Sequence, residues 1–258
     1  MSMLITLMVP LLGTGLGAAT VFLLRSELSD ALRRVLLGFA AGIMIAASVW
    51  SLLIPAIDMA ASWPLPAWIP ASAGLLSGIG FLLLLDLLLP RLYCASGQSD
   101  PSSRPLSLTA MLILAVTIHN IPEGMAVGVA YAASASGSCV LSSSAALALS
   151  LGISIQNFPE GAVISLPLRA GGASRRCAFL LGVLSGAVEP AAGFITVLFV
   201  SRLSAVLPFL LSFAAGAMLY VVIVDLIPAS QSSERSFLGT LSAAAGFTLM
   251  MILDVALG

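Results

Sequence analysis

Apolar runs long enough to cross a lipid bilayer recur along the whole of this sequence. Only 8% of its 258 residues are charged, whereas a soluble globular domain carries roughly 25%. A chain so poor in charge cannot cover itself with a soluble surface, and 18 or more consecutive apolar residues are typical of a membrane-spanning helix. We therefore expect an all-α membrane protein that crosses the bilayer several times.

The hydropathy pattern predicts a single transmembrane domain over residues 1–258 with eight spans. The connections between them are short, which leaves no room for an extramembrane domain. The net charge of −1 gives no reason to expect a nucleic-acid partner. The predicted spans cover residues 3–24, 35–57, 68–89, 106–133, 142–168, 177–200, 207–228 and 237–257.

The basic residues predict the orientation of these spans. All ten are arginines, and only Arg202 lies in an even-numbered connection. Connections rich in arginine and lysine face the cytoplasm, so both termini are expected outside, in a multi-pass protein of the cell (inner) membrane. The arginines of the odd-numbered connections are Arg25, Arg33, Arg34, Arg91, Arg104, Arg169, Arg175, Arg176 and Arg235.

A repeated pattern relates the two ends of the chain. FAAGIM at 39–44 in span two recurs as FAAGAM at 213–218 in span seven, and each is followed by Leu-Ile-Pro, ending at Pro55 and Pro228. Leu-Asp pairs also close spans three and eight. Copies five spans apart have opposite orientations, so spans 1–3 and 6–8 are expected to form an inverted repeat around spans 4 and 5, as in many secondary transporters.

The central spans carry a second repeat, HNIPEG at 119–124 and QNFPEG at 156–161. Each places a carboxylate, Glu123 or Glu160, in mid-membrane, where it costs about 2.5–3.5 kcal/mol on insertion scales. Neither span core contains a lysine or arginine that could neutralise it. The missing cation is therefore a bound metal ion or a proton.

Residue spacing favours the metal. His119 and Glu123 are four residues apart and share one helix face, as do Gln156 and Glu160. Each proline is expected to kink its helix and free a carbonyl, and irregular backbone at this depth is tolerated where it lines a cavity or is buried in protein. Imidazole with carboxylates suits zinc and its transition-metal neighbours. A hydrogen-bonding histidine or a simple kink is the alternative, but two copies argue against coincidence.

Other residues in the membrane admit two interpretations each. Glu189, directly before a proline in span six, either completes a second metal position or stabilises a helix break. Asp225, near the cytoplasmic end of span seven, either passes metal to the exit or is solvated. Asp86 and Asp254 lie at span ends, where capping is at least as good an explanation as function. Met44 is either a soft ligand or a packing residue.

These motifs resemble the ZIP (Zrt/Irt-like) family of metal transporters, on the branch with bacterial GufA-like members. The resemblance covers nearly the whole chain and is strongest in HNIPEG, QNFPEG, SGAVEP at 185–190, FAAGIMIAAS at 39–48 and LDVALG at 253–258. It implies eight helices with both termini outside, often in homodimers, in which spans 1, 4, 5 and 6 move against spans 2, 3, 7 and 8.

The resemblance also implies a two-metal site, in which it makes Met44 a ligand. Glu123 and Glu160 would bridge the two ions. The first ion would be held by Met44, His119, Glu123, Gln156 and Glu160, and the second by Asn120, Glu123, Asn157, Glu160 and Glu189.

The sequence departs from the family pattern in three places. The loop at 95–105 contains no histidine, which argues against metal sensing there. Some members carry Asp or His where Asn157 stands, so the second site has less charge. Val224 precedes Asp225 where some members have a histidine, which weakens a relay to the exit.

The sequence therefore predicts a transporter, and not an enzyme, that moves Zn²⁺ into the cytoplasm by alternating access. Fe²⁺, Mn²⁺ and Cd²⁺ are further candidate substrates, and no prosthetic group is expected. A metalloprotease would need two histidines, and the chain has one. A proton-coupled carrier of a small solute and a membrane metal sensor that does not transport are the remaining alternatives.

Overall fold

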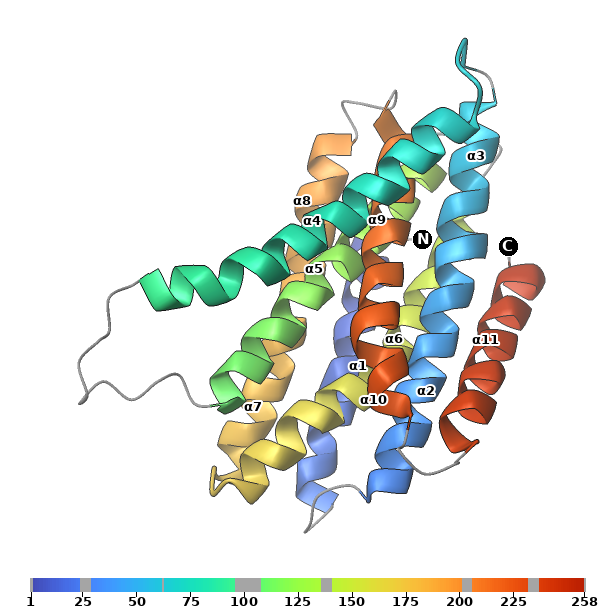
Figure 1. The fold of residues 1–258 in the computed structure, drawn as a ribbon. Coiled ribbons are helices and arrows are strands. Elements are labelled where there is room, and N and C mark those ends of the chain that lie inside the picture. The colour runs from blue at the N-terminus through green and yellow to red at the C-terminus, as the bar shows by residue number, and fades with distance from the viewer. Residues whose placement is uncertain are drawn as a thin grey trace.

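The computed structural model describes residues 2–23, 29–61, 63–95, 108–135, 141–200, 206–231 and 237–257, and these residues form helices and no strand (Figure 1). The expected all-α class is confirmed. The α-helices are α1 (Met3–Leu23), α2 (Asp30–Ala46), α3 (Ile54–Ala60), α4 (Trp68–Ala95), α5 (Leu108–Ala135), α6 (Ser143–Ala170), α7 (Arg175–Gly186), α8 (Val188–Val200), α9 (Leu207–Val221), α10 (Ile227–Ser230) and α11 (Leu238–Leu257).

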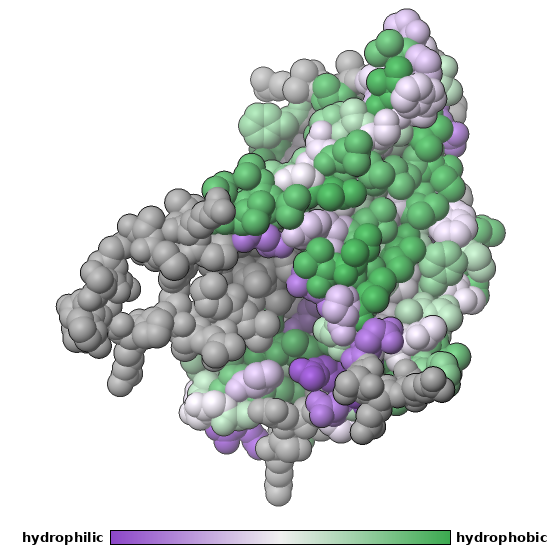
Figure 2. Space-filling model, in the orientation of Figure 1, coloured by the Kyte–Doolittle hydropathy of each residue, from purple (hydrophilic) through white to green (hydrophobic). Residues whose placement is uncertain are grey.

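Six helical segments are long and apolar enough to cross a membrane, which confirms the multi-pass class. They are Met3–Leu23, Asp30–Ala60, Trp68–Leu88, Arg175–Phe199, Leu207–Ser230 and Leu238–Leu257. Helices α5 and α6, which carry the polar motifs, are not among these six, although each is about 42 Å long at 1.5 Å per residue. Figure 2 shows hydrophobic side chains covering the outward face of α4 and its neighbours, as a bilayer-facing surface requires.

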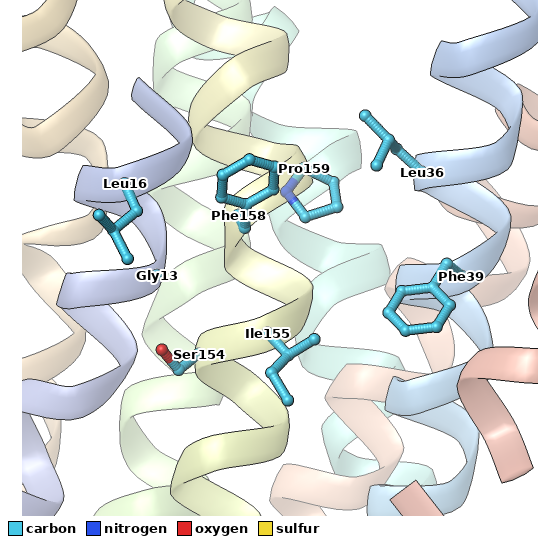
Figure 3. A pocket seen from close by; sticks show the side chains of 8 residues that line it. All are labelled: Gly13, Leu16, Leu36, Phe39, Ser154, Ile155, Phe158 and Pro159. Carbon is cyan, nitrogen blue, oxygen red and sulfur yellow. The ribbon is translucent and has the colours of Figure 1, made fainter. Parts of the chain in front are cut away.

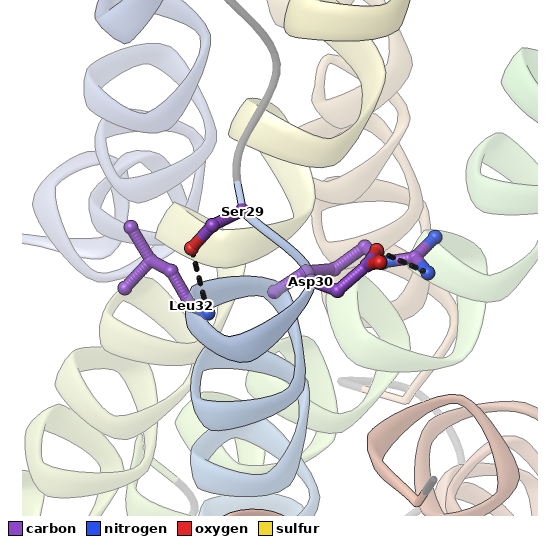
Figure 4. Close-up of polar contacts among 4 residues, drawn as sticks. Ser29, Asp30 and Leu32 are labelled. Atoms are coloured by element: carbon purple, nitrogen blue, oxygen red, sulfur yellow. Dashed lines mark hydrogen bonds and ion pairs between the residues drawn. The ribbon is translucent and has the colours of Figure 1, made fainter. Parts of the chain in front are cut away.

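Helix α2 begins earlier than the apolar pattern indicates, because a polar first turn extends it. Span two was expected from Val35, but α2 begins at Asp30, where the Ser29 hydroxyl accepts a hydrogen bond from the Leu32 amide at 3.3 Å (Figure 4). A serine oxygen here satisfies an amide that has no partner within the helix. Ser142 and Ser174 cap α6 and α7 in the same way.

Two π-helical turns, η1 (Ala47–Leu53) and η3 (Val222–Leu226), lie directly before the repeated prolines Pro55 and Pro228. In both, the residue before the proline donates its amide to the carbonyl five residues earlier. A proline ring clashes with the carbonyl four residues back, and a widened turn relieves that clash. The two halves of the sequence repeat therefore carry the same backbone irregularity.

The helices pack in two groups. The α1 group contains α1 and α5–α8: α1 packs along α6 and α7, and α5 packs along α8. The α2 group contains the continuous helix from α2 to α3, together with α4, α9–α10 and α11, in which α2 packs along α11 and α4 along α9. We call the boundary between these two groups the seam.

Within each group, helices approach so closely that glycine is required. A Cβ on Gly17 of α1 would overlap the Phe158 carbonyl oxygen of α6, and one on Gly42 of α2 would overlap the Ala243 carbonyl oxygen of α11. Small residues allow such contacts between membrane helices, where dispersion forces and not water exclusion drive association.

The seam is packed differently. Among the described glycines, Gly152 of α6 is the one that faces the opposite group, and it meets the Met250 side chain and not a helix backbone. Three aromatic pairs among the described residues, Phe22–Phe179, Trp50–Phe247 and Phe81–Phe213, also lie within a group. Close glycine-to-backbone packing therefore occurs within each group. At the seam, the described glycine contact, that of Gly152, is with side chains.

Replacing Gly42 by alanine should destabilise the protein, because the new methyl group would overlap a backbone atom of α11. Overpacking of this kind typically costs about 1–3 kcal/mol, so we expect a lower midpoint of thermal unfolding in detergent. Gly80→Ala is the matched control, because a Cβ there has nothing within 4 Å. Equal midpoints for the two variants would contradict the close α2–α11 packing.

Candidate metal centre

The central polar residues come from three helices that meet inside the α1 group. Helices α5 and α6 continue through Pro122 and Pro159. The predicted sixth span is instead interrupted at Ala187, between α7 and α8, so that Glu189 lies in the first turn of α8. The helix break that the sequence offered as one interpretation of Glu189 is therefore present.

Three carboxylates are buried together. The exposed fraction is 1% for Glu123 and Glu189 and 9% for Glu160. They lie close enough to repel one another, and among the described residues no arginine forms an ion pair with them. Buried charges are normally paired or bound to metal, so this centre needs a cation or protons.

Glu189 joins four helices through its two carboxylate oxygens. Its Oε1 accepts hydrogen bonds from Asn120 Nδ2 of α5 at 3.1 Å and from Thr14 Oγ1 of α1 at 3.3 Å. Its Oε2 accepts one from Asn157 Nδ2 of α6 at 2.7 Å. The two asparagines thus donate hydrogen bonds to Glu189 through their amide nitrogens, and their side-chain oxygens are left free to bind a cation.

A second link joins the two repeated motifs directly. Gln156 Nε2 donates to Glu123 Oε1 at 2.9 Å, so α6 supplies the donor and α5 the acceptor. The glycines that follow the two motif glutamates bring flanking helices close: Gly124 packs against the Glu189 carbonyl and Gly161 against the Thr14 carbonyl. The motif glycines therefore place α8 and α1 beside the carboxylates.

After these hydrogen bonds, five buried oxygen atoms of the centre have no donor among the described residues. They are Asn120 Oδ1, Glu123 Oε2, Gln156 Oε1, Asn157 Oδ1 and Glu160 Oε2. A buried acceptor without a partner costs about 1–3 kcal/mol, and more when charged. These five oxygens lie on adjacent helices and could serve as ligands of a cation.

The structure brings together six of the nine predicted residues: Asn120, Glu123, Gln156, Asn157, Glu160 and Glu189. Met44 is fully buried in α2, across the seam. The His119 backbone belongs to α5, but its side chain lies outside the described residues. Asp225 is exposed, in η3.

Amide side chains contribute to this centre together with the carboxylates. The part of the chain that the structure describes contains no group of three such side chains in metal-binding range. The amides of Asn120, Gln156 and Asn157 each donate a hydrogen bond to one of the carboxylates and account for three of the five unpartnered oxygens.

Sequence reasoning missed Thr14, and it did not find partners for the acids at the span ends. Thr14 is fully buried within a run of small residues in α1, and the only sequence signal was a hydroxyl inside an apolar span. Tyr220 donates to Asp86 Oδ2 at 2.6 Å, and Ser51 donates to the Asp254 carboxylate at 2.8 Å. Both of these acids are thus bonded within the α2 group.

Comparison with known proteins places this centre in a family. The profile of the family described as "ZIP Zinc transporter" matches residues 94–254. The chain belongs to the ZIP family. It is 37% identical to the zinc transporter ZIP11 of Homo sapiens and 37% identical to the zinc transporter GufA of Myxococcus xanthus, in both cases over 95% of this chain and 94% of the relative. It is 36% identical to the zinc transporter ZIPB of Bordetella bronchiseptica, over 95% of this chain and 78% of that protein. The predicted resemblance to the ZIP family and its GufA-like branch is confirmed.

The Thr14–Glu189 hydrogen bond should be needed for metal affinity in this ZIP protein. Thr14→Val keeps the side-chain shape but removes one donor to a buried carboxylate, a contact typically worth about 1.5 kcal/mol or more. We expect zinc affinity, measured by calorimetry on purified protein, to fall about tenfold.

Thr20→Val is the matched control on the same helix, because the Thr20 hydroxyl donates to the Gly17 carbonyl of its own turn at 2.7 Å and not to the polar centre. It should bind zinc as tightly as the unaltered protein. The role given to Thr14 is wrong if the two valine variants have the same affinity.

Proposed function

We propose that this protein carries Zn²⁺ across the cell membrane into the cytoplasm. One observation carries the proposal: α5 and α6 present buried oxygen atoms that accept no hydrogen bond. They lie beside carboxylates that form no ion pair with an arginine among the described residues. Similar proteins named zinc transporters support zinc as the substrate. Fe²⁺, Mn²⁺ and Cd²⁺ are further candidate substrates, since oxygen with imidazole suits several divalent metals.

The ion would bind between α5 and α6 at two adjacent positions bridged by Glu123 and Glu160. The proposed ligands of the first ion are Met44, His119, Glu123, Gln156 and Glu160, and those of the second are Asn120, Glu123, Asn157, Glu160 and Glu189. Neutral amide oxygens would make the second position the weaker one, because each carries less negative charge than a carboxylate. Asp225 is a proposed contact on the exit path.

Eight membrane spans with both termini outside fit the described helices. The segment from α2 to α3, the α7–α8 pair and the α9–α10 segment each count as one span, and α1, α4, α5, α6 and α11 are the others. Three helix ends, the end of α6 and the starts of α2 and α7, lie at the lower end of the molecule in Figure 1. They carry Arg169, Arg33, Arg34, Arg175 and Arg176. That clustering supports a cytoplasmic location for this end.

Alternating access would follow from movement of the α1 group against the α2 group. Five of the six grouped polar residues come from α5 and α6, and the sixth from α8, so the α1 group would carry the ion. The paired π-turns before Pro55 and Pro228 support the inverted repeat that such transporters use. A homodimer would provide a fixed frame for the α2 group.

Zinc uptake into proteoliposomes, followed with a trapped fluorescent indicator, tests this proposal. Glu123→Gln combined with Glu160→Gln keeps the shape of both side chains but removes both charges, and should slow uptake by at least about tenfold. Asp58→Asn is the matched control, because it neutralises an exposed acid in α3, and it should leave uptake unchanged. Uptake by the double variant at the normal rate would overturn the proposal.

The same preparation separates the alternative functions. Tight zinc binding without uptake would favour a membrane metal sensor. Uptake of a solute driven by a proton gradient, without any dependence on divalent metal, would favour a proton-coupled carrier.

Cross-linking tests the movement. In a variant without native cysteines, a bismaleimide bridge between Phe39→Cys of α2 and Ile155→Cys of α6 would tie the two groups and should abolish zinc uptake. A bridge between Phe22→Cys and Phe179→Cys joins α1 to α7 within one group, where the rings are 5.3 Å apart, and should leave uptake largely intact. Normal uptake after cross-linking across the seam would exclude relative movement of the groups.

A further inference from the structure

A groove of about 330 Å³ opens where the seam passes α6 (Figure 3). Leu16 of α1 lies on one side of it, Phe158 and Pro159 of α6 form its floor, and Leu36 and Phe39 of α2 lie on the other side. The lining is almost wholly apolar, and Ser154 adds one hydroxyl. An apolar groove offers a metal ion no ligands, so it is not a second ion path.

A second groove of about 320 Å³ lies elsewhere along the seam, between α5 and α8 of one group and α9 of the other. The sequence repeats relate the two. Leu36 and Leu210 occupy the same place in the repeat of spans two and seven, and Phe158 and Ile121 occupy the same place in the two central motifs. Both grooves therefore follow from the way the two groups meet, at opposite depths in the membrane.

The first groove is open to the bilayer and lies at the depth of an acyl chain. Leu16 is 65% exposed, so the groove has a lipid-facing mouth. Leu36 is about 9 Å along α2 from its first residue, and Phe158 is about 16 Å along α6 from Arg169. One leaflet of hydrocarbon is about 15 Å thick, so a lipid with its headgroup at these helix ends can reach the groove with one chain.

The two grooves differ in charge. Arg169, about three turns after Phe158, lies on the same side of α6 as the groove floor, and it is exposed in the last turn of the helix. Arg33 lies in the first turn of α2, one turn before Leu36, and its charge is offset by Asp30 at 3.3 Å (Figure 4). Helices α5, α8 and α9 contain no arginine or lysine. Within the part of the chain that the structure describes, only the helices of the first groove therefore carry arginines near the groove.

We propose that the groove among α1, α2 and α6 binds one acyl chain of an anionic phospholipid from the arginine-rich leaflet, with the headgroup phosphate at Arg169 and Arg33. The chain lies across the seam, in contact with both helical groups. The leaflet is cytoplasmic if the proposed orientation holds, but the binding site itself does not depend on zinc transport.

Native mass spectrometry of the purified protein tests this site, with phosphatidylglycerol and phosphatidylcholine of identical acyl chains as probes. We expect one phosphatidylglycerol to be retained about fivefold more strongly than phosphatidylcholine, the preference of one arginine near a membrane surface, because Asp30 offsets the charge of Arg33. Leu16→Trp should fill the groove and abolish retention of both lipids. Ile195→Trp places the same bulk in the second groove, at a residue that is 53% exposed, and should retain phosphatidylglycerol normally.

The headgroup contact has its own control. Arg169→Gln with Arg33→Gln should remove the preference for phosphatidylglycerol and leave acyl-chain binding, whereas Arg175→Gln with Arg176→Gln, at the start of α7, should keep the preference. Unchanged zinc affinity would establish that each variant is folded. Equal retention of the two lipids by the unaltered protein, or equal effects of the two tryptophan or the two arginine variants, would overturn the proposal.

Discussion

The burial of three carboxylates inside a membrane protein is the constraint on which the rest of this structure depends. Glu123, Glu160 and Glu189 are at most 9% exposed and repel one another. Their charge is partly balanced by amide and hydroxyl donors from α1, α5 and α6, which together satisfy Glu189 and one oxygen of Glu123. The remaining acceptors define where a cation would sit, and the helices must be held around them.

The packing of the α1 group serves that requirement. Gly124 and Gly161 follow the two motif glutamates, and the absence of a side chain at each lets α8 and α1 lie against the polar centre. The break at Ala187 then starts α8 so that Glu189 lies in its first turn. The α2 group is held together separately, through its own close glycine contacts and through the Tyr220–Asp86 and Ser51–Asp254 hydrogen bonds. The close glycine-to-backbone contacts thus lie within each group, whereas Gly152, the described glycine at the seam, meets side chains of Met250 and Ile43.

Much of this arrangement was predictable because the membrane restricts the choices. Apolar length gave the helical class, and the two PEG motifs identified the polar centre, since a mid-membrane carboxylate has few explanations other than function. The start of α2 was not predicted, because the Ser29 cap and the polar turn after it lie outside the apolar run. The π-turns before Pro55 and Pro228 and the role of Thr14 depend on contacts between distant segments, which spacing along one helix cannot show. The structure brings six of the nine predicted site residues together, and the metal-binding roles of all nine, Met44, His119 and Asp225 included, remain predictions.

The position of the ion is the central claim, and anomalous X-ray diffraction at the zinc absorption edge would test it most directly. Crystals grown with zinc should give an anomalous peak between α5 and α6, within about 2.0–2.2 Å of carboxylate oxygens of Glu123 and Glu160. A weaker second peak beside Asn120 and Asn157 would agree with partial occupancy of the second position. Zinc bound only at exposed residues, with no peak at these glutamates, would contradict the account.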